Sequence, residues 1–167
     1  MLYSTSGTSR LNWGAIKLSN TDMRMLGQDT ASSFTFRKFD GSATWTTLTA
    51  PSWPTSGLVT NSRVSLLSQG TYIFAFVIRG DASNTIAYAF YDGVVWSGWT
   101  DLTTTTKTRN YIEANYVVQA NQALVSWTET NGSNYDFKVM SITAPELEAL
   151  MRHGKAFGTN TVLPYTF

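Results

Sequence analysis

Three arginines recur at comparable places along the chain and carry the clearest potential for binding chemistry. Arg10, Arg63 and Arg109 each stand just before a predicted strand. A guanidinium is a planar fork of donors that matches a carboxylate, so converging arginines would hold an anionic ligand. The alternative is structural, because equivalent positions in a repeat make equivalent hydrogen bonds. We treat all three as candidate ligand-binding residues and keep the structural alternative open.

Tryptophans supply a second kind of candidate site, because an indole face suits the apolar C–H patches of sugar rings and its N–H can bond a hydroxyl. Trp45 and Trp99 occupy matching places in two copies of a Trp-Thr-x-Leu-Thr motif, which also favours packing between repeats. Trp96 has no counterpart in the first copy and follows an Asp92-Gly93 turn. We expect Trp96 to be the main contact with a carbohydrate, with Trp99 and Trp45 as further candidates.

The remaining reactive side chains form no catalytic pattern in the sequence. There is no cysteine and one histidine, His153, which lies near the end of a predicted short helix. The eleven Asp and Glu residues are scattered, and no spacing brings two of them to one place. We therefore expect a protein that is not an enzyme and uses no metal or cofactor. A glycoside hydrolase whose carboxylates come from distant strands is the enzymatic alternative.

Charge and hydropathy narrow the class of partner. Charged residues make up 14% of the chain, and the net charge is +1 with no basic run, so no nucleic-acid binding is predicted. The longest nearly apolar run, 72–78, is too short to cross a bilayer as a helix, so no membrane insertion is predicted. Residues 1–7 have no basic or apolar stretch, and no signal peptide is predicted. Abundant Thr, Ser and Asn without an export signal favour a virion component, such as a phage tail or capsid protein, or another extracellular surface.

An internal repeat organises most of the chain. Thr5-Ser6-Gly7 recurs as Thr55-Ser56-Gly57, and Phe39-Asp40-Gly41 recurs as Tyr91-Asp92-Gly93. These landmarks keep their order along the sequence. They define a repeat-built β domain, 1–143, with units of about 5–54, 55–106 and 107–143, and a tail, 144–167.

Each unit is predicted to hold about four short strands. In the second unit they span 63–68, 71–78, 85–91 and 95–103. Within 85–91, Ile86, Tyr88 and Phe90 alternate with smaller alanines, as on a strand with one buried face. Asp40-Gly41 and Asp92-Gly93 are strong hairpin signals, because glycine accepts a positive φ without a steric cost. The sequence thus predicts an all-β fold of repeated four-stranded antiparallel sheets. These are arranged as propeller-like blades or, alternatively, as a β-sandwich.

Residues 86–99, with the sequence IAYAFYDGVVWSGW, resemble a blade of the propeller lectins, notably the fucose-binding and related bacterial surface lectins. Residues 40–45 are faintly similar to the Asp-box of sialidase-like propellers. The resemblance covers about two blades and implies a carbohydrate-binding propeller. The sugar-binding Arg and Glu of the fucose lectins correspond here to Phe74 and Tyr88, so the resemblance does not extend to that site. In sialidases an arginine cluster holds the sugar's carboxylate, a role that would fall to the three recurring arginines.

Two features indicate assembly with other chains. Two units and a partial third, which lacks a clear Trp-Thr-x-Leu strand, are fewer than the roughly four to eight blades of a closed propeller, and unpaired sheet edges invite another chain. The tail is predicted to form one short helix, with capping-box spacing between Thr143 and Glu146 and a stop at Gly154. An extended apolar arm, 159–167, follows. The arm either docks on a neighbouring copy or forms a strand of its own fold.

These observations lead to one expected function and two alternatives. We expect a non-enzymatic, oligomeric structural or recognition protein of a virion or cell surface, with a carbohydrate-binding face. Its expected partners are copies of itself, other assembly proteins and cell-surface glycans. The alternatives are a soluble propeller lectin that binds glycans and a sialidase-like glycoside hydrolase.

Overall fold

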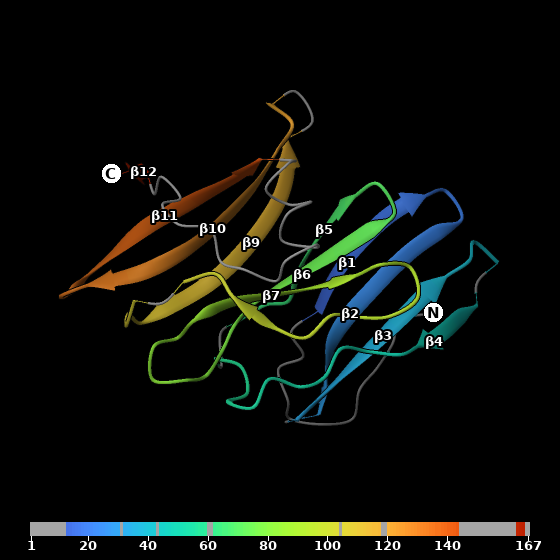
Figure 1. The fold of residues 1–167 in the computed structure, drawn as a ribbon, viewed down its shortest axis with the longest axis horizontal. Coiled ribbons are helices and arrows are strands. Elements are labelled where there is room, and N and C mark those ends of the chain that lie inside the picture. Colours follow the sequence, from blue (N-terminus) through green and yellow to red (C-terminus); the bar gives the residue numbers. More distant parts are fainter. Residues whose placement is uncertain are drawn as a thin grey trace.

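Three four-stranded antiparallel sheets make up the part of the chain that the computed structural model describes (Figure 1). The described residues are 13–30, 32–42, 44–59, 62–103, 105–117, 120–143 and 163–165. Sheet 1 contains β1 (Trp13–Ser19), β2 (Asp22–Thr30), β3 (Ser33–Phe39) and β4 (Trp45–Leu48). Sheet 2 contains β5 (Ser65–Gln69), β6 (Tyr72–Ile78), β7 (Ile86–Tyr91) and β8 (Thr100–Asp101). Sheet 3 contains β9 (Arg109–Val117), β10 (Gln122–Asn131), β11 (Asn134–Thr143) and β12 (Leu163–Tyr165).

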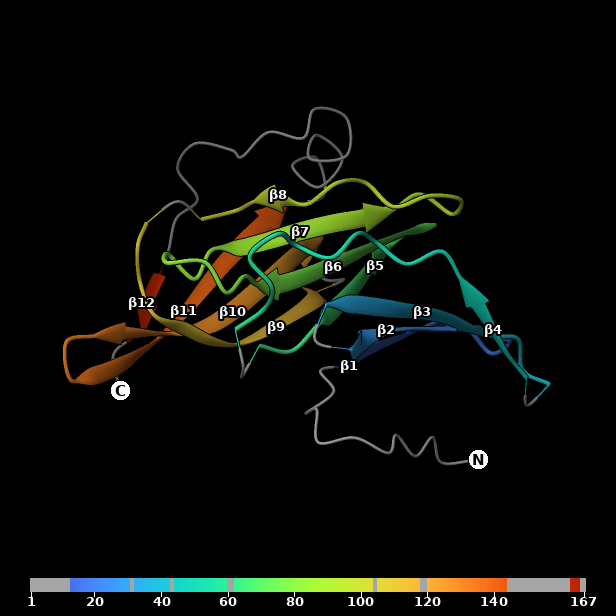
Figure 2. The same ribbon diagram turned by 90° about the horizontal axis from the view of Figure 1, so that it is seen from below.

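Within each sheet the strands follow one another in chain order, and the predicted all-β fold of repeated four-stranded antiparallel sheets is confirmed. The first strands of the sheets lie together, because β1 contacts β5 and β5 contacts β9. Sheet 2 lies between the other two in both views (Figures 1 and 2). The described residues form a row of three sheets, and no closed ring is present among them.

The middle sheet is buried on both faces, and β6 shows how. Alternate residues of a strand point to opposite faces. Residues on one face of β6 join the core shared with sheet 1, and these are Ile73, Ala75 and Val77. Residues on the other face join the core shared with sheet 3, and these are Phe74, Phe76 and Ile78. Burying each large apolar side chain contributes about 1.5–3 kcal/mol, so the two cores join all three sheets into one folded unit.

A glycine on β1 allows sheet 1 to approach sheet 2 closely. A Cβ atom built on Gly14 would lie 2.3 Å from the carbonyl oxygen of Val64 and 3.1 Å from Cγ of Leu66. No real side chain tolerates the first of these distances. The absence of a side chain at Gly14 therefore lets β1 pack directly against the strand that begins sheet 2.

The two predicted Asp-Gly turns occupy matching corners of sheets 1 and 2. Each follows the third strand of its sheet, with Gly41 at φ +87° and Gly93 at φ +105°. The preceding aspartate closes the turn, because Oδ1 of Asp40 accepts the N–H of Ser42 and Oδ1 of Asp92 accepts that of Val94. The turn chemistry that the sequence predicts is confirmed at both places.

Part of the C-terminal arm forms a strand of its own fold. β12 pairs with β11 through Val139–Leu163, Lys138–Pro164 and Phe137–Tyr165. Sheet 3 therefore takes its fourth strand from beyond the predicted third unit, which ends at residue 143. The predicted helix after Thr143 lies outside the described residues. Within them, no helix reaches the length and apolarity needed to cross a membrane.

Candidate functional site

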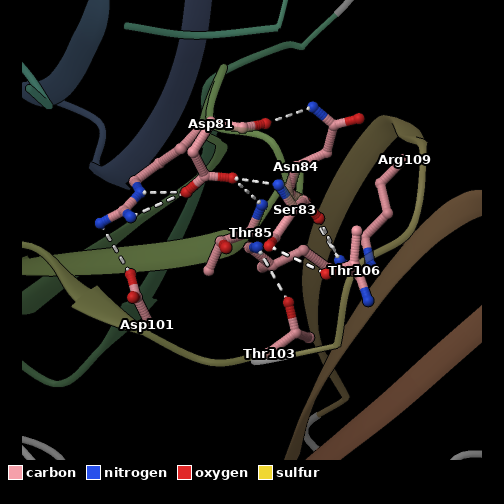
Figure 3. Close-up of polar contacts among 10 residues, drawn as sticks. Asp81, Ser83, Asn84, Thr85, Asp101, Thr103, Thr106 and Arg109 are labelled. Atoms are coloured by element: carbon pink, nitrogen blue, oxygen red, sulfur yellow. Dashed lines mark hydrogen bonds and ion pairs between the residues drawn. The ribbon is translucent and has the colours of Figure 1, made fainter. Parts of the chain in front are cut away.

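Arg109 is a buried structural residue that ties sheet 3 to the loop between β6 and β7 (Figure 3). Its side chain is 1% exposed, and its Nε lies 3.1 Å from Oε2 of Glu129. Nη1 donates to the carbonyl oxygens of Ser83 and Asn84 at 2.9 and 3.2 Å. Nη2 donates to Oγ1 of Thr105 at 2.7 Å. Burial lowers the pKa of the Arg109 guanidinium, while the charge of Glu129 raises it.

The loop that Arg109 holds is itself built around Asp81. Oδ2 of Asp81 accepts from Nε and Nη2 of Arg79 at 3.0 and 2.8 Å, and Oδ1 accepts the backbone N–H groups of Ser83 and Thr85 (Figure 3). Burial raises the pKa of Asp81, but the hydrogen bonds from Thr85 and Arg79 outweigh it and hold the pKa below its ordinary value. Nη1 of Arg79 also lies 2.9 Å from Oδ1 of Asp101. The loop is thereby fixed by charge-assisted hydrogen bonds.

The recurring arginines do not share one environment. Arg63 is exposed, whereas Arg109 is buried and already bonded to protein groups at Nε, Nη1 and Nη2. Four of the five N–H donors of Arg109 bind protein groups and its side chain is buried, so its surroundings favour the structural alternative. Arg10 lies outside the described residues.

Trp96 and Trp99 both pack at the junction of sheets 1 and 2. The Trp96 ring lies 5.1 Å from the ring of Phe36 at 77° and 5.4 Å from that of Tyr91 at 42°. Its buried Nε1 has no hydrogen-bond partner among the described residues. Nε1 of Trp99 donates to the carbonyl oxygen of Ser52 at 2.6 Å. The ring faces that were expected to meet a sugar are largely occupied by neighbouring side chains.

Strand pairing corrects the predicted equivalence of the tryptophans. Trp45 pairs with Phe39, and Trp96 pairs with Tyr91, each directly across the Asp-Gly turn of its sheet. The ring pairs have nearly the same geometry, at 5.3 Å and 43° in sheet 1 and 5.4 Å and 42° in sheet 2. Trp96, and not Trp99, is the structural counterpart of Trp45. The prediction that Trp96 lacks a counterpart is wrong. The Asp-Gly hairpin decides which residue faces the aromatic residue before the turn, and the position of the Trp-Thr-x-Leu-Thr motif does not decide it.

The outer face of sheet 1, which points away from sheet 2, carries apolar side chains beside polar ones, among them Arg37 and Thr47 in the row of Ala15 and Met25. Residues paired directly across an antiparallel sheet share a face. One row across all four strands of this face consists of Lys17, Met23, Phe39 and Trp45. Trp45 is 37% exposed, and Lys17 is exposed at the β1 end of the row. We call this surface face 1, and define it by that row together with Trp13, Ala15 and Met25.

The outer face of sheet 3 exposes aromatic side chains that sequence reasoning did not single out. Tyr135 is 68% exposed, Tyr111 is 59% exposed and Phe137 is 41% exposed. Phe137 and Tyr135 are paired with Thr128 and Thr130. The sequence carried a signal, because Tyr135, Phe137 and Val139 alternate with the polar Asp136 and Lys138, and this apolar set lies on the outer face. We call this surface face 3, and define it by Glu113, Tyr135, Phe137 and Val139, together with the exposed ring of Tyr111 at the adjoining β9 bulge.

Tyr111 is exposed at a bulge in β9. The β9–β10 register shifts between Ser126 and Thr128, so Tyr111 and Ile112 together stand opposite Trp127 and β9 has one extra residue. Tyr111 lies in this bulge with φ +54°, a left-handed conformation that a bulky side chain rarely adopts. Bulges commonly redirect a side chain toward a site of interaction. The geometry therefore turns an aromatic ring outward at a local conformational cost.

Comparison with known proteins assigns neither face a role. The chain matches no protein-family model and no curated protein.

Proposed function

We propose that this protein is a non-enzymatic structural and recognition component of a virion or cell surface, and that it works as an oligomer. One observation carries the proposal. Sheet 2 buries both of its faces within the chain, whereas sheets 1 and 3 each bury one face and leave faces 1 and 3 outward. Contiguous apolar patches on a protein surface mark sites of interaction.

The buried and partly buried charged groups support a structural role. Arg109 binds Glu129 and the carbonyl oxygen of Ser83, and Arg79 binds Asp81 in the same loop. These groups stabilise the junction of sheets 2 and 3. The sialidase-like alternative depended on the recurring arginines, and the burial of Arg109 removes one of its three candidate donors.

The proposed location follows from composition. With only 14% charged residues, the chain depends on the hydroxyl and amide groups of its many Thr, Ser and Asn residues for a polar surface. Such a surface suits a protein that is packed beside others in an assembly. Particle preparations fractionated by density and probed for this chain would test the location, and its absence from both particles and cell surfaces would contradict it.

Oligomerisation is tested by size-exclusion chromatography with light scattering over a wide range of protein concentration. We expect a mass that is a multiple of the 18.5 kDa chain, and dissociation as the protein is diluted. A mass of one chain at every concentration would contradict the proposal.

Glycan recognition is the second candidate function, favoured by the exposed rings on face 3. Tyr111, Tyr135 and Phe137 offer aromatic faces beside the hydroxyls of Thr128 and Thr130, which is the combination that sugar rings require. A glycan array probed with the wild-type protein and with Tyr135→Ala is the test. Val94→Ser is the control, because Val94 is exposed in the turn after β7 and belongs to neither face. Binding that Tyr135→Ala abolishes and Val94→Ser leaves intact would support this function, and binding to no glycan would contradict it.

A further inference from the structure

Faces 1 and 3 have complementary features and lie at opposite ends of the row of sheets. We propose that face 3 of one copy packs on face 1 of a second copy, and that the reciprocal contact closes two copies into a ring of six sheets. This inference rests on the proposed self-assembly and names its partner and its surfaces. Three observations carry it.

The first observation is the direction in which the sheets already pack. Sheet 1 covers one side of sheet 2, sheet 3 covers the other, and the first strands β1, β5 and β9 adjoin in that order (Figure 2). If the packing of each sheet on the next continues beyond sheet 3, sheet 1 of another copy packs against face 3. The β1 strand of that copy would then lie beside β9. A contact between two different faces can be repeated from copy to copy. It gives a ring if the rotation closes and a filament if it does not.

The second observation is the match of charge along the adjoining strands. The row across face 1 begins with exposed Lys17 on β1 and becomes apolar outward through Met23, Phe39 and Trp45. The corresponding row across face 3 begins with exposed Glu113 on β9 and continues through Ser126 to Val139. Each row therefore has one charge at its first strand, Lys17 or Glu113, of opposite sign in the two rows. The row of face 1 is apolar beyond that charge, and the row of face 3 passes through Ser126 before it reaches Val139.

The third observation is an equivalent contact within the chain. Ser65 stands four residues before the end of β5, and its Oγ accepts the backbone N–H of Ala114 on β9 at 2.7 Å. Glu113 stands four residues before the end of β9. Glu113 thus occupies on β9 the position that Ser65 occupies on β5, and its Oε1 lies 3.5 Å from Oγ of Ser65 at the edge of β9. In the proposed ring the first strand that follows β9 is β1 of the other copy, which carries Lys17.

Two copies are the number that closes the proposed ring of sheets. Closed propellers contain about four to eight blades, and each chain supplies three sheets, so two copies give six, the one multiple of three in that range. The ring has a two-fold axis and uses the face 1–face 3 contact twice. It leaves no outer sheet face unpaired.

Disulfide trapping tests which faces meet. The chain contains no cysteine, so the single variants K17C and E113C each introduce one thiol. When the two variants are mixed and oxidised, we expect a covalent pair of chains on a non-reducing gel. Either variant alone is expected to give little of it. Efficient pairing of K17C with itself or of E113C with itself would overturn the proposed geometry, because the same face would then meet itself.

A charge exchange gives an independent readout in solution. We expect K17E alone and E113K alone to weaken the two-copy species about tenfold, and the double variant K17E/E113K to restore most of the affinity. V94S is the control, because Val94 is 76% exposed in the turn after β7 and belongs to neither face. Equal dissociation of all four proteins would overturn the inference.

The outcomes separate this inference from the proposed function. An oligomer that the charge exchange does not affect and that gives no mixed disulfide overturns the face 1–face 3 contact but leaves self-assembly standing. A protein that stays monomeric overturns both. A ladder of masses in place of the two-copy mass overturns ring closure, because an open filament would then form.

Discussion

Arg109 and Glu129 stand directly opposite each other on β9 and β10, with Nε and Oε2 3.1 Å apart. The arginine side chain is 1% exposed and that of the glutamate 14%. From this pair the guanidinium reaches the carbonyl oxygens of the β6–β7 loop. One ion pair therefore links two strands of sheet 3 to a loop of sheet 2.

Replacing Arg109 should strongly destabilise the fold. Arg109→Met leaves Glu129 and two loop carbonyls without their donor, and breaking a buried ion pair in this way costs about 3–5 kcal/mol. Arg63→Met is the matched control, because Arg63 is exposed and surface substitutions usually change stability by about 0.5 kcal/mol or less. Urea unfolding followed by tryptophan fluorescence measures both. A similar small loss in the two variants would contradict the structural role of Arg109.

Asp81 should make stability depend on pH in the acidic range. The native pKa of Asp81 lies below its ordinary value of 3.8, so the stabilisation is complete above about pH 4 and is lost as the pH falls through the native pKa. Asp81→Asn removes the charge, so its stability deficit should be largest near neutral pH and shrink on acidification. Urea midpoints of both proteins at descending pH measure this difference. A deficit that is the same at every pH would contradict a role for the charge.

Adding a methyl group to Gly14 should separate sheets 1 and 2. The new Cβ would lie 2.3 Å from the Val64 carbonyl oxygen, so β1 has to move, and we expect Gly14→Ala to cost about 1–3 kcal/mol. Gly98→Ala is the control, because nothing lies within 4 Å of a Cβ at Gly98. Thermal unfolding of the two variants provides the comparison. If Gly98→Ala were the more damaging change, the close β1–β5 contact would not be important for stability.

Local sequence signals predicted the strands and turns well, because their causes are local. Asp40-Gly41 and Asp92-Gly93 gave the two turns. The alternation of Ile86, Tyr88 and Phe90 with smaller residues predicted one buried face for β7, and the structure buries both, because sheets 1 and 3 cover the two sides of sheet 2. The sequence did not predict that residues 163–165 form the fourth strand of sheet 3. These residues lie far along the chain, and only pairing with β11 assigns them there.

Relations between distant residues explain the remaining differences. Trp45 and Trp99 share a motif, yet the pairing of Tyr91 with Trp96 makes Trp96 the counterpart of Trp45. Arg109 looked like a ligand-binding residue because its sequence position does not reveal that the loop carbonyls surround it. The exposed rings of face 3 were overlooked because an aromatic residue on a strand suits a core equally well.

Tyr111 differs from the other described non-glycine residues with a positive φ. Those residues are Asn84 at φ +43° and Asn121 at φ +51°, and asparagine tolerates this conformation well. Tyr111, at φ +54°, pays a conformational cost that its 59% exposed ring does not offset by burial. Strain of this kind is expected where a side chain serves an interaction.

Tyr111→Asn should therefore stabilise the fold and weaken the binding of face 3. We expect the free energy of unfolding to rise by about 0.5–1 kcal/mol, because asparagine adopts a left-handed conformation more readily than tyrosine. The loss of the ring should at the same time weaken the two-copy association, or glycan binding if that is the role of face 3, by about tenfold or more. Urea unfolding at a concentration where the chain is monomeric gives the first quantity, and light scattering or the glycan array gives the second. A variant that loses stability and binds normally would show that the bulge is held by packing of the Tyr111 ring. A functional role for the strain at Tyr111 would then be wrong.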